Sequence, residues 1–245
     1  MDNYQAPADL LSGRVILVTG AGQGIGRIAA LTFAAHGATV ILHGRKVQKL
    51  EAVYDEMEQA GYPQPAIFPL DLEKAEGKDF AALAQAISSQ IGRLDGILHN
   101  AAHFTSLTPL EHQNLESWLA TLRVNLMAPF ALTQACMPLL KKAPDASVVV
   151  TGETHGHAPS AYWGPYAVSK CGLEAMVTIW AQELEIYSNV RINALIPGPV
   201  DSPLRLRTHP AELKDTMRKP EDLMSTYLYL MGRDSAGTTG QVLAC

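Results

Sequence analysis

Short apolar runs alternate along the chain with longer stretches whose apolar residues recur at helical spacing. The stretches predict a helix from Ile25 to just before Gly37, and further helices over about 46–60, 78–91, 114–140, 165–187 and 220–232. The runs predict strands over 14–18, 38–42, 65–70, 95–98, 147–151 and 191–196, with a weaker one over 241–244. Strands this uniformly apolar are typical of parallel sheets covered on both faces. The pattern therefore predicts an α/β fold with a doubly wound parallel sheet.

No repeat, low-complexity tract or linker divides the chain, and 245 residues with 47% apolar content fit one large domain. We predict an N-terminal extension over 1–11 and a single domain over 12–245. The most loop-like segment runs from Pro197 to about Pro220, directly after the strand over 191–196. Open α/β sheets bind their ligands at this end of the strands, so the segment is predicted to border the binding site.

Charge and composition narrow the possible partners. A net charge of -5 offers no basic excess for nucleic acid, which is therefore not expected as a partner. The three cysteines predict neither a disulfide framework nor a structural zinc site and fit a reducing compartment. The acidic N-terminus lacks the pattern of a secretory leader, and no apolar stretch is long enough to span a bilayer. These features predict a cytoplasmic protein without a membrane partner.

A glycine-rich turn links the first predicted strand to the first helix. It reads Thr19-Gly20-Ala21-Gly22-Gln23-Gly24-Ile25-Gly26. Glycines permit a tight turn and close approach of the backbone to a phosphate, whose charge is favoured at a helix N-terminus. The turn is thus predicted to bind the pyrophosphate of a dinucleotide through Gly20, Gln23, Gly24, Ile25 and Gly26.

The spacing of Gly20, Gly24 and Gly26 after Thr19 resembles that of the short-chain dehydrogenase/reductase family. The similarity extends in order through Asp71-Leu72, His99-Asn100-Ala101-Ala102, Asn125, Tyr166-x-x-x-Lys170 and Pro197-Gly198, from about residue 12 to the C-terminus. The HGR, LDG-L-HNA, YWG-YA-SK and YLYLMG stretches further resemble a subgroup, the YciK-type bacterial oxidoreductases.

This resemblance implies a single Rossmann-type domain of about seven strands with helices on both faces. It also implies an oxidoreductase that moves a hydride between a nicotinamide cofactor and a small-molecule carbonyl or alcohol. Helices similar to those over 114–140 and 165–187 make the subunit contacts in this family, so a homodimer or homotetramer is expected. Beyond the glycine turn, the resemblance implies cofactor contacts from Asp71, Leu72, Asn100, Ala101, Tyr166, Lys170, Pro197, Gly198, Val200 and Ser202.

The end of the second strand indicates which nicotinamide cofactor is preferred. Family members that use NAD carry Asp at the position of Gly44, and Arg45 follows as a donor for a 2′-phosphate. The sequence therefore predicts NADP(H) in preference to NAD(H). Arg45 could instead be a solvated residue at a basic helix start, and Asp71 could cap the following segment in addition to, or instead of, binding adenine.

The resemblance assigns acid/base catalysis to Tyr166, with Lys170 one helical turn further on and Asn125 supporting a proton relay. A nearby cation favours the phenolate form of a tyrosine. Lowering a tyrosine pKa from about 10 to about 7 takes roughly 4 kcal/mol, more than one exposed Lys supplies. The positive charge of the oxidised nicotinamide is therefore expected to contribute.

Glu153 occupies the position of the family's catalytic serine, thirteen residues before Tyr166. A carboxylate only accepts hydrogen bonds and opposes negative charge on the substrate oxygen. Three hypotheses follow: Glu153 is protonated and donates, Thr154 or Thr151 supplies the hydroxyl, or the chain binds cofactor but turns over slowly. Of these, rescue by a threonine is favoured. The third corresponds to an alternative function, a dinucleotide-binding sensor or structural protein.

Two further patterns have alternative interpretations. His155 and His157 lie beside Glu153, but no additional ligand stands at a metal-site spacing, so no metal is predicted. Arg205 and Arg207 could select an anionic substrate, or could equally be solvated.

Overall fold

The computed structural model describes residues 4–186, 189–213 and 217–245, and these contain a seven-stranded, entirely parallel sheet. The strand order is β3-β2-β1-β4-β5-β6-β7. Apolar residues fill most of the central strands, as expected of strands covered on both faces. The predicted fold class is confirmed. The strands are β1 (Val15–Thr19), β2 (Thr39–Gly44), β3 (Ala66–Pro69), β4 (Gly96–His99), β5 (Ala146–Thr151), β6 (Val190–Ile196) and β7 (Val242–Ala244).

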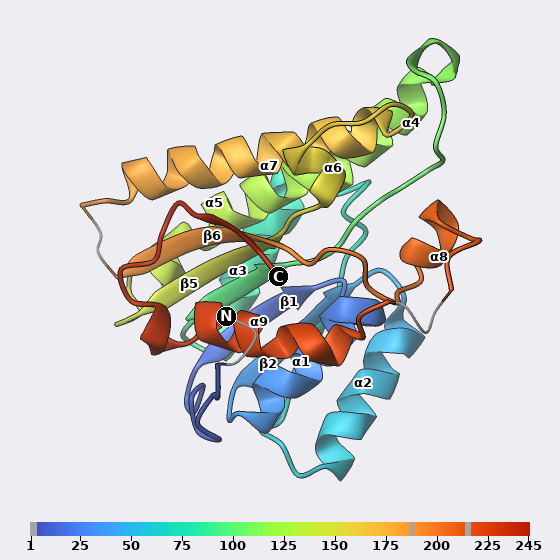
Figure 1. Ribbon diagram of the computed structural model, residues 1–245. Coiled ribbons are helices and arrows are strands. Elements are labelled where there is room, and N and C mark those ends of the chain that lie inside the picture. The colour runs from blue at the N-terminus through green and yellow to red at the C-terminus, as the bar shows by residue number, and fades with distance from the viewer. Residues whose placement is uncertain (1–3, 187–188, 214–216) are drawn as a thin grey trace.

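Helices cover both faces of the sheet (Figure 1). One face packs against α1 (Gly24–Ala35), α2 (Val47–Gln59) and α9 (Met224–Met231). The other face packs against α3 (Gly77–Gln90), α5 (Ala128–Leu140) and α7 (Gly164–Glu183). Two apolar cores result, one on each side of the sheet, and they fix the strand ends that carry the site.

The helix predicted over 114–140 is interrupted near its middle. It consists of α4 (Leu115–Leu122), a π-helical turn over Arg123–Met127 and then α5. Asn125 lies within the π turn and is completely buried. Single π turns inside α-helices are frequent at functional sites, because they redirect a side chain that regular geometry would place elsewhere.

Two short helices fall in stretches without a predicted element. They are α6 (Thr154–His157), directly after β5, and α8 (Arg205–Thr208), inside the long loop that follows β6. The helix predicted to reach residue 187 ends at Glu183, and residue 187 itself lies outside the described residues. Residues 1–3 of the predicted extension over 1–11 also lie outside the described residues. In the remainder of that segment, Leu10 and Leu11 are buried in the core, and the Tyr4 ring contacts the Tyr229 ring edge-on.

Candidate active site

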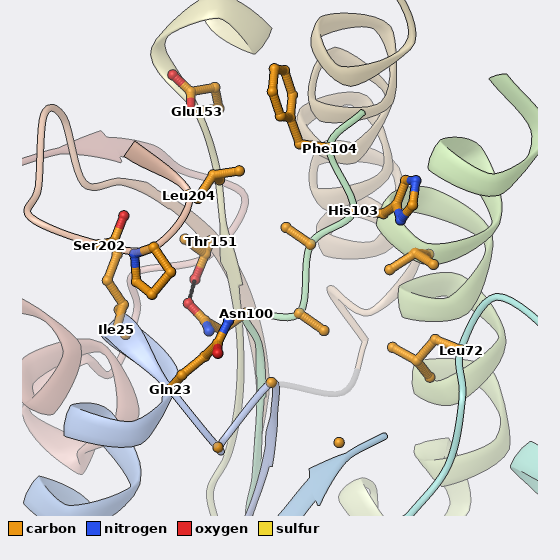
Figure 2. A pocket seen from close by; sticks show the side chains of 18 of the residues that line it. Gln23, Ile25, Leu72, Asn100, His103, Phe104, Thr151, Glu153, Ser202 and Leu204 are labelled. Atoms are coloured by element: carbon orange, nitrogen blue, oxygen red, sulfur yellow. Dashed lines mark hydrogen bonds between the residues drawn. The ribbon is translucent and has the colours of Figure 1, made fainter. Parts of the chain in front are cut away.

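A cavity of about 360 Å³ opens at the carboxyl ends of the strands. It spans the point between β1 and β4 where the strand order reverses, which is where open α/β sheets bind dinucleotides. Figure 2 shows Glu153, Phe104 and Leu204 gathered at one end of this cavity, and Gln23 and Leu72 toward the other. We call these the substrate end and the adenosine end.

Most residues with a predicted cofactor role line this one cavity. They are Gly20, Gln23, Gly24, Ile25, Gly44, Arg45, Asp71, Leu72, Asn100, Ala101, Tyr166, Lys170, Pro197, Gly198, Val200 and Ser202. Gly26 lies behind the wall instead. A Cβ atom there would stand 2.4 Å from the carbonyl oxygen of Gly20, so only glycine permits this packing.

The glycine turn leaves the start of α1 available to an anion. Gly20 adopts φ +68°, and a Cβ added to it would meet the backbone of Ala101 at 3.0 Å. Gln23 precedes α1 without capping it through a side-chain hydrogen bond within the described structure, and its side chain instead accepts from Lys49 Nζ. The uncapped N–H groups and the helix dipole therefore suit a pyrophosphate, which is an observation that fits a dinucleotide.

Cations gather where β2 ends at the adenosine end. Arg45, Lys46 and Lys49 are exposed and line the cavity beside Gly44. Asp71 also lines it, and its Oδ1 accepts from the backbone N–H of Glu73 at 3.2 Å, so it caps the following turn while facing the cavity. Both roles considered for Asp71 are thus geometrically available.

His43, just before Gly44, had no predicted role. Its side chain is completely buried against the cavity wall, and neither ring nitrogen has a hydrogen-bond partner among the described residues. Burial lowers the pKa of His43 to about 4, so the ring is neutral at physiological pH. His99, at the end of β4, is also buried, and its Nε2 lies 2.8 Å from Thr133 Oγ1. Burial, with smaller effects of His43 and Lys170, lowers the pKa of His99 to about 3.

Tyr166 and Lys170 lie one turn apart on α7 and both line the cavity while almost fully buried. Lys170 Nζ donates to the carbonyl oxygen of Thr151 at 2.7 Å and stands 5.8 Å from the centre of the Tyr166 ring. Burial lowers the pKa of Lys170 to about 8, and the negative charge of Glu153 opposes that change. Burial, assisted by Glu153, raises the pKa of Tyr166. The protein without cofactor therefore holds Tyr166 protonated.

Asn125 does not line the cavity. Its Oδ1 accepts from the backbone N–H of His103 at 2.7 Å, and its Nδ2 donates to the carbonyl oxygen of His103 at 2.9 Å and to Ser169 Oγ at 3.1 Å. The side chain therefore links the loop after β4 to α7, next to Lys170. In this arrangement Asn125 positions the two segments that carry the site.

Glu153 lines the substrate end, whereas Thr154 is exposed and lies outside the cavity wall as described. Thr151 lines the cavity, and its Oγ1 lies 3.0 Å from the Tyr227 hydroxyl and 3.3 Å from Asn100 Oδ1, the contact drawn as a dashed line in Figure 2. Of the two candidate threonines, only Thr151 has a hydroxyl beside the cavity, and that hydroxyl already has partners.

Aromatic side chains that sequence patterns did not assign surround Tyr166. Phe104 meets its ring edge-on with centres 5.5 Å apart, and Trp163 lies 5.9 Å away from it. His155 stacks on Trp163 at 3.9 Å. Trp163 precedes Tyr166 by three residues at the start of α7, but Phe104 and His155 come from other segments, so no local spacing predicts their contacts.

Arg205 and Arg207, in the long loop after β6, are both engaged within the protein. Arg205 forms an ion pair with Glu212 through Nε, and its second amine lies 2.9 Å from Glu212 Oε1. Arg207 donates to the carbonyl oxygens of Phe104 and Thr105 at 2.9 and 3.0 Å, and its side chain is exposed at the cavity mouth. The charge of Arg205 is therefore balanced by a carboxylate, whereas Arg207 keeps its positive charge at the cavity wall.

In the described part of the chain, no group of three or more His, Cys, Asp or Glu side chains is placed to hold a metal ion. His155 and His157 instead contact Ser160 and Glu174. Nor does any described helix have the length and apolar character needed to cross a membrane.

Comparison with known proteins agrees with the fold and the cavity. Residues 14–212 match the short chain dehydrogenase family, and the chain belongs to it. The oxidoreductase YciK of Escherichia coli K12 is 42% identical over 97% of this chain and 94% of its own length.

Solved structures of relatives superpose closely. A short chain dehydrogenase from Pseudomonas syringae has a TM-score of 0.95 at 44% identity, covering 100% of this chain and 99% of that one. One from Escherichia coli CFT073, complexed with NADPH, has a TM-score of 0.94 at 41% identity, covering 97% and 98%. The predicted family and its YciK-like subgroup are confirmed.

Proposed function

We propose that the protein is an NADP(H)-dependent oxidoreductase that moves a hydride between nicotinamide and a polar double bond of a small molecule. The carbonyl/alcohol pair implied by the family is the general form of this reaction. The observation that carries the proposal is that Tyr166 and Lys170 are buried together in the wall of the cavity that also contains the glycine turn. A dinucleotide site and a proton donor thus share one enclosed space.

The preference for NADP(H) is supported by charge. Arg45, Lys46 and Lys49 stand beside Gly44, where a carboxylate would repel a 2′-phosphate. A solved relative that is 41% identical was complexed with NADPH, which agrees with this preference.

Each catalytic side chain has a distinct role in the proposal. Tyr166 exchanges a proton with the heteroatom of the substrate, and Lys170 places a positive charge beside it on α7. Asn125 holds the loop after β4 against α7 and acts as a positioning residue. When bound, the nicotinamide supplies or accepts the hydride.

Self-association is part of the proposal. The helices α4, α5 and α7 and the π turn between α4 and α5 expose large apolar side chains, namely Leu115, Leu119, Met127, Phe130, Val168 and Ile179. Exposed apolar surface of this kind is typical of subunit interfaces, and it supports the homodimer or homotetramer expected from the sequence.

Single-turnover oxidation of bound NADPH tests the proposal. Wild-type protein mixed with excess carbonyl or imine acceptors should oxidise the bound NADPH. Tyr166→Phe should still bind NADPH but should slow its oxidation by carbonyl acceptors, which need a proton donor, by about 10³-fold. The presence of Glu153 in the cavity favours a second candidate, a dinucleotide-binding protein without turnover. NADPH binding without oxidation by any acceptor would establish the second candidate instead.

A further inference from the structure

Glu153 forms no ion pair with any of the described residues. It precedes α6, and its Oε1 accepts from the backbone N–H of His155 at 3.5 Å, the long limit of a hydrogen bond. Glutamate is not among the preferred N-capping residues, and the helix it precedes has only four residues. Helix capping therefore does not account for a carboxylate at this position.

The charge of Glu153 acts on the reacting centre. Glu153 lines the same cavity as Tyr166 and Lys170, and its negative charge influences the proton affinity of both. Compared with a neutral hydroxyl at this position, the carboxylate makes the site more negative by one unit. Reduction of a neutral carbonyl develops negative charge on oxygen, which this carboxylate opposes. Reduction of a cationic acceptor begins with a positive charge on the substrate. A carboxylate stabilises this charge most in the bound substrate and less as the hydride arrives, so it acts mainly by favouring binding of the cation.

We propose that the substrate of this site is a protonated or alkylated imine, a C=N group carrying a positive charge, and that Glu153 is its counter-ion. The inference rests on the proposed NADPH-dependent hydride transfer and changes the heteroatom of the substrate from oxygen to nitrogen. Glu153 is thereby a specificity-determining residue, in the place where a hydroxyl would favour a carbonyl.

The chemistry balances without a proton donor in the hydride step. The iminium carbon accepts the hydride with its electron pair from NADPH and forms a C–H bond. The C=N π pair becomes the lone pair of nitrogen, so the substrate is reduced to an amine while NADPH is oxidised to NADP⁺. The amine then takes a proton from water. Tyr166, whose pKa is raised by burial, can therefore remain protonated throughout.

The surroundings of Glu153 contain aromatic rings that can hold a cation, as Arg207 over the Phe104 ring shows, together with cations that the fold itself engages. Phe104 stands at the same end of the cavity and is part of the aromatic group around Tyr166, and aromatic faces attract cations (Figure 2). Among the nearby cations, Arg205 is paired with Glu212, and Arg207 lies over the Phe104 ring but is exposed to solvent at the mouth. Lys170 donates to the carbonyl oxygen of Thr151, and burial lowers the pKa of His155.

The test compares two probes on NADPH-loaded protein: N-methyl-3,4-dihydroisoquinolinium, a permanent cation, and α-tetralone, a neutral ketone of similar size. Wild-type protein should show a kcat/KM at least about 10-fold higher for the iminium. Glu153→Gln keeps the shape and removes the charge, so it should lower the kcat/KM for the iminium about 100-fold and raise the kcat/KM for the ketone. Glu153→Ser keeps a capping side chain and adds a hydroxyl, so it should favour the ketone.

Glu111→Gln is the matched control, because its carboxylate is exposed and outside the cavity; it should leave both rates unchanged. An iminium-to-ketone ratio that is the same in wild type and Glu153→Gln overturns the inference, as does a wild type that prefers the ketone. Calorimetry with the product amine on the NADP⁺-loaded protein provides a second readout, with affinity about 10-fold weaker in Glu153→Gln. If neither the wild type nor any variant oxidises NADPH, the proposed function fails. Equal affinities of wild type and Glu153→Gln for the amine would, as a separate result, reject the role of Glu153 as a counter-ion.

Discussion

The adenosine end and the substrate end of the cavity are built in different ways. At the adenosine end, backbone geometry dominates: Gly20 and Gly26 allow chain segments to touch, and the start of α1 presents N–H groups. At the substrate end, side chains from distant segments meet, with Phe104 after β4, Glu153 after β5 and Arg207 in α8. The first end fixes how a dinucleotide lies. The second decides what it reacts with, and there a single carboxylate changes the electrostatics of the reaction.

The difference shows which positions can vary without loss of the fold. A side chain at Gly26 would collide with the backbone, so change there damages the structure itself. Glu153 lies in the cavity wall between β5 and α7, and its side chain fixes no close backbone contact of this kind. Chemistry at the substrate end can therefore diverge within an unchanged scaffold.

The largest predicted effect is on the pH dependence of stability, and it concerns His43, a buried polar group at the adenosine end. It tests whether this end of the cavity is part of the folded core. Its pKa of about 4 in the folded state lies below 6.5, the ordinary value, so the unfolded chain binds more protons as pH falls through this range. Stability should therefore fall from pH 6.5 toward pH 4. We expect His43→Leu to reduce the loss of unfolding free energy between pH 7 and pH 5 by about 2 kcal/mol, measured by urea unfolding.

His99 is expected to contribute in the same direction, so the pH dependence should shrink in His43→Leu and not vanish. The exposed residue His112 serves as a control, and His112→Asn should leave the pH dependence unchanged. An identical loss in wild type and His43→Leu would show that His43 is not buried in its neutral form.

A smaller effect tests the cation cluster. Arg45→Ser should weaken NADPH binding about 10-fold at low ionic strength and leave NADH binding unchanged, since only NADPH carries the 2′-phosphate. Fluorescence titration with both cofactors measures this. Lys78→Ser, a change of an exposed residue on α3, controls for net charge. If Arg45→Ser weakened the binding of NADPH and NADH equally, Arg45 would not contact the 2′-phosphate and would act only through its overall charge.

The last prediction compares the two candidate threonines, and the smallest expected effect is that of Thr154. Thr154 is exposed outside the cavity, so Thr154→Ala should change kcat/KM by less than about two-fold. Thr151→Val removes hydroxyl contacts to Tyr227 and Asn100 and should lower kcat/KM about 10-fold. Steady-state rates on one acceptor compare the two. A larger loss in Thr154→Ala would mean that α6 rearranges when substrate binds.

The fold and the adenosine end could be predicted because their signals are local. Buried parallel strands appear as continuous apolar runs, and the glycine turn shows directly in the order of residues from Gly20 to Gly26. Tyr166 and Lys170 share a helix face at a spacing of four residues, which is also visible in the chain.

The substrate end could not be predicted to the same depth. The helices α6 and α8 are single turns of four residues, too short to show a hydrophobic period. The pairing of Arg205 with Glu212 and the packing of Phe104 on Tyr166 depend on how loops close in space. The lack of hydrogen-bond partners for the His43 ring among the described residues could not be predicted either. The sequence of an apolar strand does not show whether the ring nitrogens of a histidine within it are hydrogen-bonded.

The π turn at Asn125 has a consequence for how the gene can change. A π turn closes its hydrogen bonds one residue later than an α-helix does, so this helix carries one codon more than its length requires. Deleting a codon within Arg123–Met127 would restore regular geometry and leave the reading frame intact. The α-helical segments on either side would keep their orientation relative to one another, because the π turn absorbs the extra residue as a bulge. Asn125 would no longer be placed to form its hydrogen bonds with His103 and Ser169. This in-frame deletion should therefore leave the helix intact but disrupt the assembly of the site.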